Sequence, residues 1–169
     1  MGWKVNASLL SSAKTDWQTP DEVLDLVRKV GPIDLDPCTT ADNPTGAARF
    51  FVKGDNGLKQ NWGECIGDNE LIFVNPPYGR SIGRWTEKCR REAHRRNRII
   101  ALVPDRTDTA WFNDALDSAD AACLWRGRIT FRGAPAPAPF PSALIYWGDC
   151  VSLFANAFRS RGRILAGGK

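Results

Sequence analysis

Short apolar runs alternate along the chain with segments of helical spacing, a pattern that is typical of α/β proteins. Three of the runs, at residues 33–38, 70–74 and 99–103, are rich in aliphatic residues, and each leads into a proline. Such runs predict buried strands of a covered sheet. Because the carboxyl ends of parallel strands meet at one edge, the residues that end these runs are candidates for a ligand site.

The first helix is predicted between Thr19 and Gly31, where apolar residues recur at the spacing of one helical face. Thr19 is the expected N-cap, Pro20 fits the first turn, and Glu22 completes a capping box three residues after the cap. A second helix is predicted from Ser81 onward, with an apolar stripe and many arginines on its other faces. The apolar sides of both helices would pack on the sheet.

The rest of the chain is expected to complete a three-layer α/β sheet, mostly parallel, whose final strand is antiparallel. Residues 1–14 show no periodicity and are interpreted as an N-terminal arm, which leaves residues 15–169 as a single domain. The other predicted elements are an edge strand at 48–52, a loop anchored by Trp62, a helix capped by Asp108 or Thr109, strand-like segments at 121–125 and 129–131, a proline-alanine loop at 133–141, an apolar strand at 142–147, and a C-terminal segment packed by Phe154 and Phe158.

The composition indicates a soluble globular protein, since 43% of the 169 residues are hydrophobic and 25% are charged. No apolar run approaches the length of a membrane span, and the first residues lack the features of a signal peptide. The five cysteines are scattered without a Cys-x-x-Cys pair. We therefore expect no disulfide framework, no metal site and a cytoplasmic location. A net charge of +4 permits a polyanionic partner.

The segment Asn75-Pro76-Pro77-Tyr78 directly follows the predicted strand at residues 70–74. Its prolines lack an N–H and stiffen the turn, so the free polar atoms of the backbone are carbonyls. The side-chain oxygen of Asn75 and the carbonyl of Pro76 can converge as two acceptors for an exocyclic amino group. Accepting both N–H bonds of adenine N6 would stabilise the positive charge that develops as the nitrogen attacks. Tyr78 offers a flat face on which the base can stack.

Two carboxylates are candidates for a cofactor pocket. Asp36 would emerge at the same edge as Asn75, where it can accept hydrogen bonds from an ammonium or a ribose hydroxyl. Asp55 lies in a turn, and it can either contact the cofactor or only cap that turn. The arginines of the helix that begins at Ser81 suit phosphate contacts, and a merely solvated helix stays open as the alternative.

With these segments placed, the chain resembles the phage and prophage DNA N6-adenine methyltransferases of the Dam type, from about Asp16 to Gly162. The resemblance implies a Rossmann-like fold that binds S-adenosylmethionine, with no separate target-recognition domain. It also implies direct transfer of the methyl group to an adenine flipped out of double-stranded DNA. The motifs that carry it are Asp16-x-Gln18-Thr19-Pro20, Leu35-Asp36-Pro37-Cys38, Asp55-x-Gly57-Leu58, Asn75-Pro76-Pro77-Tyr78-Gly79, Pro104-x-Arg106-Thr107-Asp108 and Gly127-Arg128-x-x-Phe131.

The candidate site residues fall into three groups. For catalysis they are Asn75, Pro76, Pro77 and Tyr78; for the cofactor, Trp17, Thr19, Pro20, Asp36, Pro37 and Asp55; and for nucleic acid, Arg84, Lys88, Arg91, Arg95, Arg106 and Arg128. The resemblance also implies a bacterial host cell and a role in restriction and modification.

Three other functions stay open on the sequence alone. The same two acceptors can hold any planar amino group, which includes the side-chain amide of a glutamine in a protein. RNA adenine offers the same amino group as DNA adenine. A DNA-binding module without catalysis is the third alternative, and the intact motif at Asn75 to Tyr78 argues against it.

Overall fold

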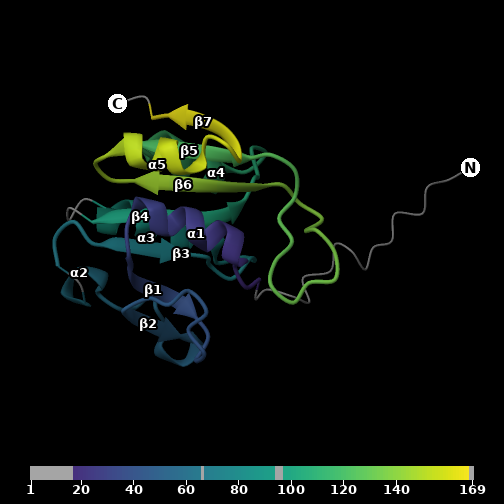
Figure 1. Cartoon of the computed structure of the whole chain (residues 1–169). Helices are drawn as coiled ribbons and strands as arrows, with labels where there is room; N and C mark the ends of the chain where they lie inside the picture. Colours follow the sequence, from purple (N-terminus) through teal and green to yellow (C-terminus); the bar gives the residue numbers. More distant parts are fainter. Residues whose placement is uncertain (1–16, 66, 94–96, 168–169) are drawn as a thin grey trace, which may run out of the picture.

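The computed structural model describes residues 17–65, 67–93 and 97–167, and it has a mixed α/β fold (Figure 1). Within these ranges one seven-stranded sheet has the order β2-β1-β3-β4-β6-β5-β7. The strands are β1 (Ile33–Thr39), β2 (Arg49–Val52), β3 (Leu71–Val74), β4 (Arg98–Pro104), β5 (Ala121–Trp125), β6 (Ser142–Trp147) and β7 (Gly162–Ala166). The helices are α1 (Asp21–Val30), η2 (Lys53–Asp55), α2 (Trp62–Cys65), α3 (Ile82–Ala93), α4 (Ala110–Ser118) and α5 (Val151–Phe158).

Both faces of the sheet are covered, and successive side chains of each strand enter two different apolar cores. Phe73 and Leu102 lie in the core under α1 and α5, whereas Ile72 and Ala101 lie in the core under α3 and α4 (Figure 1). All four residues of β3 are buried, which explains why this strand is a continuous apolar run in the sequence.

The strand directions bring several loops to one edge of the sheet. Strands β1 to β4 run parallel to one another, β6 is antiparallel to β4, and β5 is antiparallel to β6. Strand β5 therefore has the direction of β4, and β7 runs antiparallel to it. The carboxyl ends of β1, β3, β4 and β5 meet at this edge together with the first residues of β6 and β7. We call it the carboxyl edge.

Most of the predicted strands and helices are confirmed, with two differences in the second half of the chain. Residues 129–131 form no strand, although Ile129 and Phe131 are buried as their apolar side chains require. Strand β6 is antiparallel to β4 as predicted, but the sequence did not indicate β7, which pairs with β5. Phe154 and Phe158 are buried, as expected for the C-terminal segment, and they lie on α5. Strand β7 is a half-exposed edge strand, and such strands leave a weak apolar pattern.

The predicted capping box at the start of α1 is wrong. The helix begins at Asp21, its N-cap is Pro20, and no side chain caps it. The hydroxyl of Thr19 instead accepts a hydrogen bond from the side chain of Asn75 at 3.0 Å. A long-range contact has replaced the local one, which is a common sign of a functional site.

In the ranges that the structure describes, no helix is long and apolar enough to cross a membrane. The expected arm at residues 1–14 lies outside those ranges, so the division into an arm and one domain stays a prediction.

Candidate functional site

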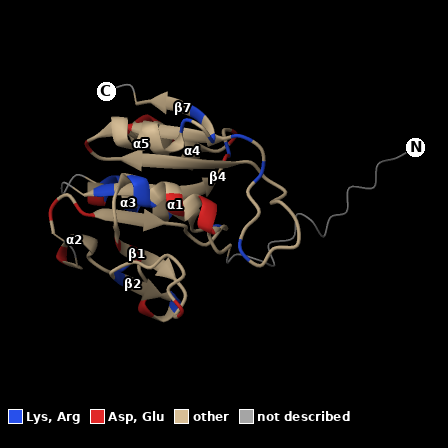
Figure 2. Cartoon of the chain, in the orientation of Figure 1, with Lys and Arg blue, Asp and Glu red and all other residues tan. Residues whose placement is uncertain are grey.

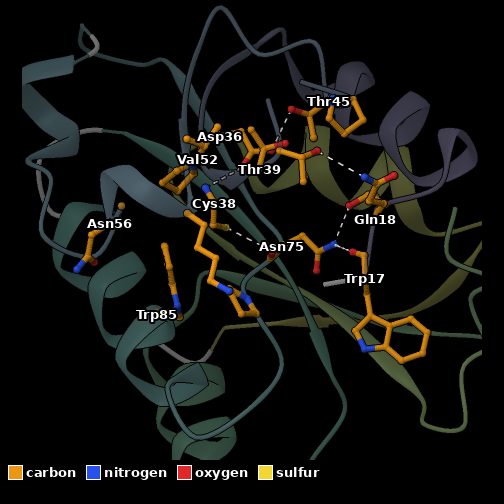
Figure 3. A pocket seen from close by; sticks show the side chains of 17 residues that line it. Trp17, Gln18, Asp36, Cys38, Thr39, Thr45, Val52, Asn56, Asn75 and Trp85 are labelled. Atoms are coloured by element: carbon orange, nitrogen blue, oxygen red, sulfur yellow. Dashed lines mark hydrogen bonds between the residues drawn. The ribbon is translucent and has the colours of Figure 1, made fainter. Parts of the chain in front are cut away.

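A cavity of about 240 Å³ lies at the carboxyl edge, beside the ends of β1 and β3 (Figure 3). Its walls come from the segment before α1, from the end of β1 and the loop after it, from the turn around η2, from the residues after β3, and from α3. The lining residues are Trp17, Gln18, Thr19, Asp36, Pro37, Cys38, Thr39, Thr40, Pro44, Thr45, Val52, Lys53, Asn56, Gly57, Asn75, Pro77 and Trp85. The cavity thus joins segments that are far apart in the sequence.

The side-chain amide of Asn75 is held in one orientation. Its Nδ2 donates to the backbone carbonyl of Trp17 and to Oγ1 of Thr19 (Figure 3). Because a carbonyl only accepts hydrogen bonds, the amide nitrogen and not the oxygen must face Trp17. The buried Oδ1 of Asn75 accepts no hydrogen bond from the described residues. A buried acceptor without a donor costs about 1–3 kcal/mol, so this oxygen is a strong candidate for a ligand contact.

The backbone at the same residue is fixed from the neighbouring strand. Sγ of Cys38 donates to the carbonyl oxygen of Asn75 at 3.3 Å. Burial raises the pKa of the Cys38 thiol well above its usual range, so the sulfur keeps the proton that it donates. Asn75 is therefore held by β1 through its backbone and by the segment before α1 through its side chain.

Asp36 is a buried carboxylate in the wall of the cavity, with only 3% of its surface exposed. Its Oδ1 accepts from the backbone N–H of Cys38 at 3.1 Å, and its Oδ2 accepts from Oγ1 of Thr45 at 2.9 Å. Burial raises the pKa of Asp36 to about 6, because these hydrogen bonds oppose the cost of burying its charge only in part. The carboxylate can still accept a further hydrogen bond, so a ligand with donor groups would favour the ionised form.

Tyr78 lies in an aromatic cluster next to the cavity rather than in its wall. Its hydroxyl donates to the carbonyl oxygen of Leu102 at 3.2 Å, and burial raises the pKa of this phenol, which keeps it a donor. The ring centroid of Tyr78 lies 5.5 Å from that of Phe140 and 6.1 Å from that of Phe131. Trp17 packs against the same two phenylalanines at 5.5 Å and 5.2 Å. The cluster therefore joins the predicted catalytic motif to the proline-alanine loop.

The other predicted residues divide into those that line the cavity and those that do not. Trp17, Thr19, Asp36 and Pro37 line it, as do Asn75 and Pro77 of the predicted catalytic motif. Pro20 is the N-cap of α1, and Pro76 is buried beside the cavity, where its carbonyl accepts no hydrogen bond from the described residues.

Asp55 stands outside the cavity wall and caps a turn. Its carboxylate accepts from the backbone N–H of Val52 at 2.8 Å. Capping of the turn is one of the two roles that the sequence left open for Asp55. The other role, cofactor binding, stays a prediction. The neighbouring residues Lys53, Asn56 and Gly57 line the cavity in its place.

Eleven of the seventeen lining residues were not selected as site residues from the sequence, and Gly57 shows which signal was present. A Cβ at this glycine would lie 1.9 Å from the carbonyl oxygen of Pro37, so only glycine lets the two loops approach so closely. The indole Nε1 of Trp62 donates to the Gly57 carbonyl at 2.9 Å, which confirms Trp62 as the anchor of this loop. The sequence shows the Asp-Asn-Gly turn, but it does not show that this turn packs against Pro37.

The residues predicted for nucleic acid lie in several places on the surface. Arg84, Arg91 and Arg128 are exposed, and Arg106 pairs with Asp108 at 2.8 Å. Lys88 pairs with Glu92 at 2.9 Å and lies 4.8 Å from the ring centroid of Trp62. Arg95 lies outside the described residues.

Comparison with known proteins supports one family. No curated protein matches the chain. A family model described as DNA N-6-adenine-methyltransferase (Dam) matches residues 6–142, which cover most of the 169 residues and every segment of the cavity wall. Membership implies methyl transfer to the N6 amino group of adenine in DNA, with S-adenosylmethionine as the methyl donor. The resemblance found in the sequence is thereby confirmed, and the chain belongs to the DNA N-6-adenine-methyltransferase (Dam) family.

Proposed function

We propose that this protein methylates adenine N6 in double-stranded DNA, with the base flipped out of the helix against the segment Asn75 to Tyr78. The observation that carries this proposal is the buried Oδ1 of Asn75, an acceptor without a donor at the wall of the cavity. An exocyclic amino group supplies the missing donor. Because N6 cannot approach a methyl donor while the base is stacked in the duplex, flipping is required.

The residues of the cavity fit S-adenosylmethionine. Asp36 offers a carboxylate for ribose hydroxyls or an ammonium, and Trp17, Val52 and Trp85 offer apolar surface for the adenine and the methionine chain. When bound, this cofactor supplies an electrophilic methyl group. A Rossmann-like arrangement follows from the same proposal, since the ligand would then lie at the carboxyl ends of parallel strands.

Asn75 is proposed to act through its amide oxygen. The hydrogen bonds from Nδ2 to Trp17 and Thr19 prevent the amide from turning its nitrogen toward the substrate. Oδ1 then accepts an N6–H bond and stabilises the positive charge that develops on the nitrogen. This arrangement needs no reorientation during the reaction, because the surrounding contacts already hold it. The carbonyl of Pro76 remains the proposed second acceptor.

Tyr78 is proposed to receive the flipped base on its ring. Its hydroxyl bond to Leu102 fixes the ring, and Phe131 and Phe140 pack at steep interplanar angles of 84° and 69° to it. Base stacking on an aromatic side chain contributes roughly 1–3 kcal/mol in single-strand binding proteins. The proline-alanine loop that carries Phe140 would lie beside the bound base.

The test is a comparison of substrate classes. Purified protein is incubated with methyl-labelled S-adenosylmethionine and, in separate reactions, with unmethylated duplex DNA, unstructured RNA and a protein extract. We expect label in the duplex DNA alone. Label in the protein extract but not in DNA would support the glutamine-amide alternative, and cofactor binding without any labelled product would support a binding module.

A further inference from the structure

Four arginines surround the carboxyl end of β5. Arg126 and Arg128 follow that strand, Arg159 ends α5, and Arg163 is the second residue of β7. All four are exposed. None of them forms an ion pair or a side-chain hydrogen bond with another residue in the described part of the chain. We call this set the arginine cluster.

The arginine cluster lies on the same edge of the sheet as the candidate site. Leu124 pairs with Arg163 across β5 and β7, and the backbone N–H of Arg126 donates to the carbonyl of Arg161 at 2.8 Å. Farther along the same loop, the N–H of Arg132 donates to the carbonyl of Gln18 at 2.9 Å. Gln18 lines the cavity. One loop therefore connects the arginine cluster to the cavity wall.

The nearby acids are already paired with other arginines. Arg132 pairs with Asp21, and Arg161 pairs with Glu22 at 2.7 Å, so the first turn of α1 is neutralised by the loop and by the start of β7. Arg161 also lies 5.6 Å from the ring centroid of Trp125. These contacts fix the backbone around the arginine cluster while they leave its own guanidinium groups available for a ligand.

Basic residues also lie on α3 (Figure 2), where some are paired with acids of the same helix and others, such as Arg84 and Arg91, are exposed. Arg90 pairs with Glu87 at 2.6 Å, as Lys88 does with Glu92. Because α3 connects the carboxyl end of β3 to the amino end of β4, it runs away from the carboxyl edge. At a rise of about 1.5 Å per residue, Arg91 lies about 14 Å along the helix from its start.

We propose that the arginine cluster binds the phosphates of duplex DNA beside the flipped adenine, an inference that rests on the proposed function. The C-terminal half of α3, which lies away from the carboxyl edge, does not bind them. Strand spacing of about 4.8 Å puts the end of β5 roughly 14 Å, and β7 roughly 19 Å, from the end of β3. At about 3.4 Å per phosphate along one strand, this distance corresponds to roughly four to six phosphates. The arginine cluster thus supplies phosphate contacts on one side of the flipped base.

The experiment measures the salt dependence of binding to a short unmethylated duplex by fluorescence anisotropy. The cluster variant is Arg126→Gln, Arg128→Gln and Arg163→Gln. The control variant is Lys29→Gln, Arg90→Gln and Arg91→Gln, which removes the same number of charges toward the opposite edge. Each phosphate contact contributes about 0.9 to the slope of log K against log salt, so the cluster variant should lose up to about 2.7 and the control almost nothing.

Equal slopes for the wild type and the cluster variant would overturn the inference, and so would a larger loss in the control. The variant Arg126→Gln with Arg128→Gln, which changes only an exposed loop, is measured beside it to guard against misfolding, and it should lose up to about 1.8. The anisotropy measurement reports DNA binding alone and does not depend on methyl transfer. A wild type that binds DNA but produces no methylated base would therefore count against the proposed function and leave this inference standing.

Discussion

The two halves of the carboxyl edge use polar groups in opposite ways. Around β1 and β3, the polar side chains are buried and contact one another, as Asp36 does with Thr45 and Asn75 with Thr19. Around β5 and β7, the arginines are exposed, and four of them contact no other side chain by an ion pair or hydrogen bond in the described ranges. The first half is rigid before any ligand arrives, whereas the second is left free to adapt.

This difference follows from the ligand that each half is proposed to bind. A small cofactor and a single base need fixed donors and acceptors, because misplacement by a fraction of an ångström weakens catalysis. A DNA backbone is a long and uniform polyanion, so long side chains that reorient in solvent can follow it. The comparison predicts that substitutions in the first half change turnover or cofactor affinity, and that substitutions in the second change the salt dependence of binding.

The largest effect is expected for Asn75→Ala. The substitution removes the only side-chain acceptor proposed to contact N6, so kcat should fall by about 10²- to 10³-fold. Cofactor affinity, measured by isothermal titration calorimetry, should stay within about twofold, since Asp36 and the rest of the cavity wall are retained. Turnover at the wild-type rate would show that the buried Oδ1 has no role in the reaction.

The next effect concerns Tyr78. Tyr78→Ala should weaken capture of the flipped base by roughly 1–3 kcal/mol, which corresponds to about 5- to 150-fold in kcat/KM. Tyr78→Phe is the matched control, because it keeps the ring and removes only the hydrogen bond to Leu102. An equal loss in both variants would assign Tyr78 a structural role in place of stacking. Fluorescence of a 2-aminopurine placed at the target position reports the flipping directly.

The pH dependence of cofactor affinity tests Asp36. Because its pKa is raised to about 6, the side chain is ionised at neutral pH and becomes protonated as the pH falls through that value. A ligand that donates to the carboxylate should then bind about tenfold more weakly for each pH unit below about 6. Asp36→Asn should bind weakly at every pH and abolish the dependence. A flat profile for the wild type would exclude Asp36 from the cofactor contacts.

The smallest effect is expected for Thr19→Val. The variant removes one of the two acceptors of the Asn75 amide and leaves the Trp17 carbonyl in place. Loss of one hydrogen bond of about 0.5–1.5 kcal/mol should lower kcat by roughly 2- to 12-fold with little change in KM. Thr19→Ser keeps the hydroxyl and should restore the rate. An equal loss in Thr19→Ser would show that the rate depends on how the side chain packs and not on the hydrogen bond from Asn75.

The sequence predicted the parts of the fold in which the signal is local. Strand β3 and the motif after it were placed correctly because a continuous apolar run and two prolines leave few alternatives. Thr19 was misplaced as a helix cap because its partner, Asn75, is 56 residues away along the chain. Local rules cannot include such a contact.

Long-range contacts also explain which residues were missed in the cavity wall and at the carboxyl edge. Thr45 and Gly57 reach the cavity only because the loops after β1 and β2 fold back on Asp36 and Pro37. Arg163 was not selected because β7 was not predicted, and the arginine cluster exists only when β7 lies beside β5. The arginines of α3 were selected because they are dense in sequence, although the fold directs most of them away from the carboxyl edge.

The measurement that tests the central claim most directly is nucleoside mass spectrometry of unmethylated genomic DNA after incubation with the protein and S-adenosylmethionine. The two acceptors after β3 are proposed to select an amino group, and we assign that group to adenine. We predict N6-methyladenine in the wild-type reaction and almost none with Asn75→Ala. N4-methylcytosine, or unmodified DNA from protein that binds the cofactor, would contradict the account.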